Sequence, residues 1–299
     1  MPLSNIVLLS CANVVSRSSL NVIDRLLFSQ SKMGFLRLYF FTNALPLILG
    51  ISLLIFVKTE TTFWSYFFTF PCLFLALSTH LVGMSFSYAF RYCQVRQVVI
   101  KAKMPELLFA LAAFIPVISK NLPRCSLGLN TYLVIATTMI GLIFLFTGKR
   151  SKILSLFDKT GLYIIGSLLV QMICSSFILI SAKTVAEIML LSIAMLLWRC
   201  CLMLPVLFIP MKTQTPIDDP DSLKMLGVLS FRAILALTTQ ITFTWCVVKG
   251  SPLLIWPIMN TTPLVASIVS QCVLKENPHW TEIAALLCFF SGSTCTVFL

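Results

Sequence analysis

Polar and ionisable residues recur inside the apolar segments of this chain, where they could bind a solute. Ser10, Asn13, Arg17, Asn21 and Asp24 follow one another along the first apolar segment. At 100° per residue of a helix, their side chains fall within an arc of about 80°. Such a stripe either lines a water-filled cavity or forms a buried polar network between helices, and both interpretations stand.

A basic group follows at 91–106. Lys101 precedes Pro105 by four residues, and a proline at that distance frees a backbone carbonyl and kinks a helix. We therefore expect Lys101 to contact a ligand. Arg91 and Arg96 are better suited to the membrane interface, where long basic side chains extend towards water.

His80 and Gln240 lie deep in two other apolar segments. They either form satisfied buried polar groups or bind a substrate, and His80 has a side chain suited to proton coupling. Aromatic and amide side chains could complete a cavity by stacking and hydrogen bonding. The predicted substrate-binding residues are Asn13, Arg17, Asn21, His80, Tyr88, Lys101, Gln240, Trp245, Trp256 and Asn260.

Motifs for catalysis do not occur in the sequence. There is no G-x-S-x-G, no glycine-rich phosphate loop, no H-E-x-x-H and no pair of carboxylates inside an apolar segment. The chain has only two histidines, so we expect no metal site. The sequence predicts that the protein is not an enzyme and needs no cofactor.

The elements that must position these residues are membrane helices. Of 299 residues, 58% are apolar and 11% charged, and the mean hydropathy is +0.97; soluble domains carry about 25% charged residues. Each apolar run is long enough to cross about 30 Å of hydrocarbon. The predicted spans are 4–28, 33–57, 64–90, 96–119, 128–147, 160–182, 186–210, 225–248, 252–274 and 280–299. The net charge of +12 lies at span ends and in short loops, which favours membrane flanks over nucleic-acid binding.

The sequence also repeats itself weakly. A-L-S-T-H at Ala76–His80 recurs as A-L-T-T-Q at Ala236–Gln240, 160 residues later. Three further pairs keep the same order: Arg37 with Arg199, Arg91 with Lys249, and Pro105 with Pro263.

This repeat predicts two five-helix halves, residues 1–149 and 150–299. Because each half has an odd number of crossings, the halves must lie in the membrane with opposite orientations. Inverted repeats of this kind are typical of secondary transporters, whose binding site lies between the halves near mid-membrane. The predicted fold is an all-α polytopic membrane protein of about ten transmembrane helices in two inverted five-helix repeats.

The ends of both halves carry a resemblance to a known family. The stretch P-L-V-A-S-I-V-S-Q-C-V-L-K-E runs from Pro263 to Glu276 and is followed by Gly292; the first half echoes it from Pro105 to Gly141. This arrangement resembles the EamA-like drug/metabolite transporter superfamily. The resemblance implies two inverted five-helix repeats, a central cavity and movement of small organic solutes by alternating access.

One local stretch is similar to a particular branch of that superfamily. V-I-K-A-K-M-P-E at Val99–Glu106 is similar to the I-K-A-x-x-P stretch of sugar-phosphate and nucleotide-sugar transporters. In that branch the lysine faces anionic substrate, which implies the same place for Lys101. The second half has no matching basic pair.

Together these features predict a secondary transporter for a small polar metabolite, such as an amino acid, a nucleoside-like cofactor or a phosphorylated metabolite. A drug effluxer of the same fold and a non-transporting membrane scaffold or assembly subunit stay open as alternatives. The expected partners are the lipid bilayer, the substrate, and a coupling proton or counter-substrate, but not nucleic acid. The cell (inner) membrane is favoured over an organelle membrane; the oligomeric state is not predicted.

Overall fold

The computed structural model describes residues 3–30, 34–56, 62–112, 157–177, 182, 184–208, 221–249 and 262–275, with scattered residues in 132–144 and 280–291. Within these residues the fold is helical, and no strand occurs among them. The helices are α1 Leu3–Gln30, α2 Phe35–Leu54, α3 Phe63–Phe67, α4 Phe70–Tyr92, α5 Val95–Ala112, α9 Lys159–Phe177, α10 Val185–Leu207, α11 Asp221–Lys249 and α13 Thr262–Leu274.

Four of these helices are long and apolar enough to cross a membrane: the spans are Phe35–Leu54, Phe70–Tyr92, Val185–Pro205 and Met225–Cys246. Shorter apolar helices occur at Lys159–Cys174 and Val265–Leu274. The predicted all-α membrane class is confirmed. The count of ten spans and the inverted repeat stay predictions, because most of the fifth and tenth predicted spans and the start of the ninth lie outside the described residues.

The third predicted span is two helices rather than one. The short α3 ends before Thr69, whose side chain caps α4 by accepting a hydrogen bond from the Cys72 backbone N–H at 3.4 Å. Pro71 lies in the first turn of α4, where a missing N–H costs no helical hydrogen bond. Phe67, the last residue of α3, stacks on Trp198 of α10, with ring centroids 4.6 Å apart. The chain therefore turns at the Thr69 cap.

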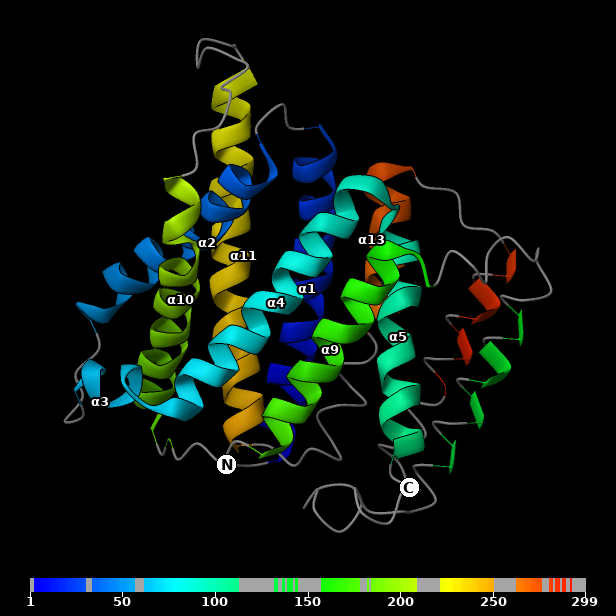
Figure 1. The fold of residues 1–299 in the computed structure, drawn as a ribbon, viewed down its shortest axis with the longest axis horizontal. Coiled ribbons are helices and arrows are strands. Elements are labelled where there is room, and N and C mark those ends of the chain that lie inside the picture. The colour runs from blue at the N-terminus through cyan, green and yellow to red at the C-terminus, as the bar shows by residue number, and fades with distance from the viewer. Residues whose placement is uncertain are drawn as a thin grey trace.

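Helices from the two predicted halves pack against each other along the bundle. α1 lies against α11 and α13, α2 against α10 and α11, and α4 against α9 and α10 (Figure 1). The contact between α2 and α10 is close, since a Cβ added at Gly50 would lie 3.0 Å from Ile193 Cγ1. The interfaces between the predicted halves are therefore the places where polar residues from both can meet.

Candidate functional site

The polar stripe of α1 faces α11. Asn13 donates hydrogen bonds from Nδ2 to the Thr239 carbonyl and to Thr242 Oγ1, each at 2.9 Å. Ser16 Oγ accepts a hydrogen bond from Thr239 Oγ1 at 3.0 Å, and Ser10 Oγ lies 3.4 Å from Cys246 Sγ. Most of this seam is therefore a buried polar network that joins the two helices, the second of the two interpretations of the stripe.

An ion pair lies further along the same seam. The Arg232 guanidinium donates to both carboxylate oxygens of Asp24, at 2.5 and 3.1 Å, and also to the Thr42 carbonyl at 2.6 Å. Both charged side chains are less than a tenth exposed. Because the carboxylate matches the guanidinium in charge and shape, this pair is internally compensated and links α1, α2 and α11.

Arg17 and Asn21 differ from their neighbours on the stripe. Asn21 is buried and Arg17 partly buried, yet within the described residues neither makes a hydrogen bond, and Arg17 has no carboxylate partner. Burial of a charge without a partner is costly unless something else compensates it. For these two side chains, contact with a substrate stays open as the interpretation of the stripe.

A second polar cluster lies where α2, α4 and α10 meet. Tyr39 Oη donates a hydrogen bond to the His80 carbonyl at 3.0 Å, and the two rings lie 5.5 Å apart. Arg199 lies close enough to act electrostatically on both Tyr39 and His80. A Cβ added at Gly83 would lie 2.9 Å from Tyr39 Oη and 3.0 Å from Arg199 Nη2, so the glycine makes room for both. We call Tyr39, Asn43, His80, Gly83 and Arg199 the Arg199 cluster.

Several polar atoms of this cluster have no partner. Among the described residues, Arg199 Nε, His80 Nδ1 and Asn43 Oδ1 are buried and make no hydrogen bond. His80 and Asn43 are 6% and 1% exposed. The two ion pairs found in the described part of the chain both lie elsewhere, so the charge of Arg199 is not compensated there. Buried polar groups are normally satisfied, so a cluster of such atoms calls for an explanation.

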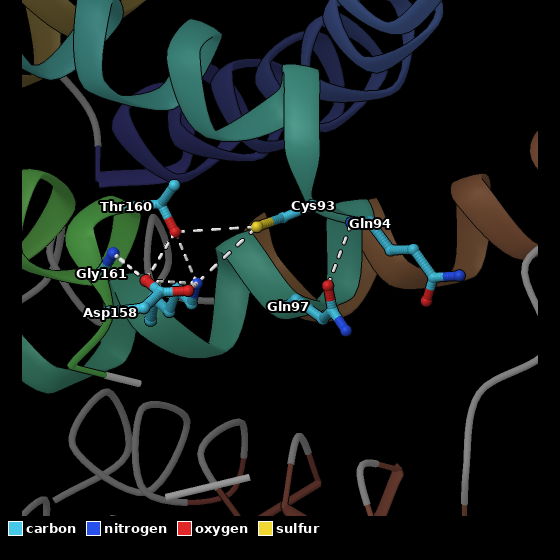
Figure 2. Close-up of polar contacts among 7 residues, drawn as sticks. Cys93, Gln94, Gln97, Asp158, Thr160 and Gly161 are labelled. Atoms are coloured by element: carbon cyan, nitrogen blue, oxygen red, sulfur yellow. Dashed lines mark hydrogen bonds and ion pairs between the residues drawn. The ribbon is translucent and has the colours of Figure 1, made fainter. Parts of the chain in front are cut away.

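Lys101 is engaged within the protein. It is 3% exposed, and its Nζ lies 2.8 Å from Asp158 Oδ2 and 2.6 Å from Thr160 Oγ1, at the start of α9 (Figure 2). Thr160 also donates to Asp158 Oδ1 at 2.7 Å, and Cys93 Sγ lies 3.7 Å from both Lys101 Nζ and Thr160 Oγ1. The contact joins α5 to the first turn of α9.

Asp158 is the acidic partner in this contact and lies just outside α9. Its partial burial favours the neutral acid, but hydrogen bonds from Lys101, Thr160 and the Gly161 backbone N–H favour the carboxylate and outweigh burial. The pKa of Asp158 therefore lies below its ordinary value. A carboxylate before the first turn also suits the positive end of the helix dipole.

Of the remaining predicted residues, the structure describes Gln240, Tyr88 and Trp245. Gln240 hydrogen-bonds Thr244 Oγ1 on its own helix at 3.3 Å, and Tyr88 packs on Phe35 and Tyr163 at the end of α4. Trp245 has a buried indole N–H without a partner in the described chain. Trp256 and Asn260 lie outside the described residues. No group of three or more metal-ligating side chains occurs in the part of the chain searched.

Comparison with known proteins identifies the second half of the chain. The model of the EamA-like transporter family matches residues 161–298. This segment is similar to that family, and we call residues 161–298 the EamA-like segment. The match confirms the predicted resemblance over these residues, and it indicates a membrane transporter of the drug/metabolite kind.

The fold is also found among solved structures. Eighteen solved chains match, and one of them, titled only as the crystal structure of a protein, covers 99% of this chain and 98% of its own at a TM-score of 0.62. Its sequence is 13% identical, so the likeness concerns the fold alone. None of the curated proteins searched matches the chain.

Two arginines of the EamA-like segment were not predicted as site residues from the sequence. Arg232 and Arg199 lie on α11 and α10, inside helices that are otherwise strongly apolar. The repeat had paired Arg199 with Arg37, but Arg37 is exposed in the first turn of α2 while Arg199 lies well inside α10. The signal that could have found Arg199 is an intramembrane cation, which is a functional-site hypothesis by default.

Proposed function

We propose that the protein is a secondary transporter that moves a small polar organic metabolite across a membrane by alternating access between two halves. The EamA-like match supports a transporter. The finer proposal depends on one observation: Arg17 and Asn21 lie on the polar stripe of α1 without protein partners in the described chain. A cation in that place favours an anionic or zwitterionic solute.

Within this proposal Asn13, Arg17, Asn21 and His80 are the first residues to examine as substrate contacts. A substrate role for Lys101 stays a prediction, because its ammonium already has Asp158 and Thr160 as partners. Substitution of Lys101 by Ala separates the two roles. Loss of flux with unchanged thermal stability would support substrate contact, whereas loss of stability with retained flux would support the link between α5 and α9.

The test is transport by the purified full-length chain in liposomes. Vesicles are incubated with a mixture of amino acids, nucleosides and phosphorylated metabolites, and their contents are measured by mass spectrometry. We expect at least one anionic or zwitterionic solute to enter faster than into protein-free vesicles, and Arg17→Gln to slow it. Entry of no solute above the protein-free rate would contradict the proposal and favour the scaffold alternative. Entry of apolar cations alone would favour the drug effluxer.

A further inference from the structure

We propose that the Arg199 cluster is a binding site for the carboxylate of a small organic monocarboxylate, with Arg199 as the residue that binds the charge. This inference depends on the proposed transport function for its biological meaning, and it names the substrate class. The cluster joins α2 and α4 of the first half to α10 of the second.

The cluster contains one cation, and its nearest polar neighbours are a phenol, an imidazole and an amide. Arg232 also acts electrostatically on Tyr39, but its charge is matched by Asp24. One positive charge is therefore left over, in surroundings where uncompensated charge is expensive. A singly charged anion neutralises it, whereas a phosphate dianion would bring a new excess charge.

Arg199 Nη2 lies beside Tyr39 Oη at Gly83, while Nε, on the same edge of the guanidinium, has no partner within the described residues. A guanidinium presents donors in a planar fork that matches the two oxygens of a carboxylate. The free Nε makes Arg199 a donor towards a ligand, and the side chain as a whole is only partly buried.

His80 Nδ1 and Asn43 Oδ1 are unpartnered, and their side chains are more than nine-tenths buried. A ligand with hydroxyl groups near its carboxylate could satisfy both, because a hydroxyl donates and accepts. The site therefore favours a hydroxylated monocarboxylate over a purely apolar one.

The binding test uses thermal stabilisation of the purified full-length protein. The probes are gluconate, lactate and acetate as monocarboxylates, glucose 6-phosphate as a phosphate monoester, serine as a zwitterion and glucose as a neutral control. A ligand that binds the folded state raises its apparent stability. We expect gluconate or lactate to stabilise the wild type most, and Arg199→Gln to weaken that binding about 10- to 100-fold, as for loss of a charged hydrogen bond.

Glycine variants keep the test informative if Arg199→Gln folds poorly. Gly83→Ala puts a methyl group against Arg199 Nη2 and Tyr39 Oη, so it displaces the guanidinium without removing its charge. Gly166→Ala is the matched control, since a Cβ there meets nothing within 4 Å. Arg91→Gln removes an exposed cation from α4 as a control for charge. We expect Gly83→Ala to lose the stabilisation and both controls to keep it.

Each outcome decides the inference. The inference is overturned if a monocarboxylate stabilises Arg199→Gln and Gly83→Ala as strongly as the wild type. It is also overturned if the wild type is stabilised more by glucose 6-phosphate or serine, or if none of the monocarboxylates stabilises it. Flux of the stabilising monocarboxylate into proteoliposomes tests the proposed function separately. Binding that depends on Arg199 without flux would support the site and contradict the proposed transport. Flux that is unaffected by Arg199→Gln would support transport and contradict the site.

Discussion

Arg232 and Arg199 lie on neighbouring helices of the EamA-like segment, and they differ in whether the protein provides a counter-ion for their charge. Arg232 is 6% exposed, and its guanidinium donates hydrogen bonds to Asp24 and to the Thr42 carbonyl. Arg199 has a phenol beside it and, within the described chain, no carboxylate. A buried cation with an internal counter-ion therefore holds helices together, whereas one without a counter-ion is available to a ligand.

The largest expected effect comes from breaking the compensated pair. Asp24→Ala leaves Arg232 buried without its counter-ion, and loss of one partner of a buried pair costs about 3–5 kcal/mol. Thermal unfolding of the purified protein in detergent measures the loss. The double variant Asp24→Leu with Arg232→Met removes both charges and should recover most of the stability. If Asp24→Ala unfolds at the wild-type temperature, the pair does not link the helices.

A smaller effect is expected at the Lys101–Asp158 contact, because 41% of the Asp158 side chain is exposed. Asp158→Asn should cost about 1 kcal/mol at pH 7, at the upper end for pairs that water reaches. The pKa of Asp158 is lower in the folded protein than in the unfolded chain, where it is about 3.9. The contribution is therefore present above about pH 4 and is lost as the pH falls through the folded-state pKa.

The measurement is the difference in unfolding temperature between wild type and Asp158→Asn from pH 7 to pH 3. We expect the difference to shrink at the acid end. A difference that stays constant or grows as the pH falls would show that the carboxylate does not stabilise this contact. Arg91→Gln, at an exposed position, controls for general effects of charge.

The smallest expected effect on stability is that of Arg199→Met, and it tests the difference between Arg199 and Arg232 most closely. Since this side chain has no counter-ion in the described chain, replacing it by an apolar one of similar length should change the free energy of unfolding by less than about 1 kcal/mol. Arg232→Met should instead destabilise strongly, because Asp24 is left alone. Equal loss in the two variants, measured by thermal unfolding, would mean that Arg199 has an internal partner after all.

Much of the helical framework could be predicted from hydropathy. α1, α2, α10 and α11 begin and end within a few residues of the predicted spans, and α9 begins within one residue of its span, because backbone groups in lipid must be satisfied within each segment. The division of the third span was missed, although its signal is local: a threonine cap at Thr69 followed by Pro71. Hydropathy alone does not respond to a capping residue.

The polar residues were predictable only in part. Helical spacing correctly placed Asn13, Asn21 and Asp24 on one buried face, since that follows from the geometry of a single helix. The partners of Asn13 and Asp24 on α11 lie more than 200 residues away, and no local pattern specifies such a pairing. The lack of a counter-ion at Arg199 is likewise a property of the packed bundle and could not be read from α10 by itself.

In the proposed site, the uncompensated charge of Arg199 binds a ligand carboxylate. The most direct test compares the affinity of the best-binding monocarboxylate with that of its uncharged amide, by titration calorimetry on wild type and Arg199→Gln. The account predicts that the wild type prefers the carboxylate at least about tenfold and that Arg199→Gln loses this preference. An equal preference for the carboxylate in both proteins would contradict it.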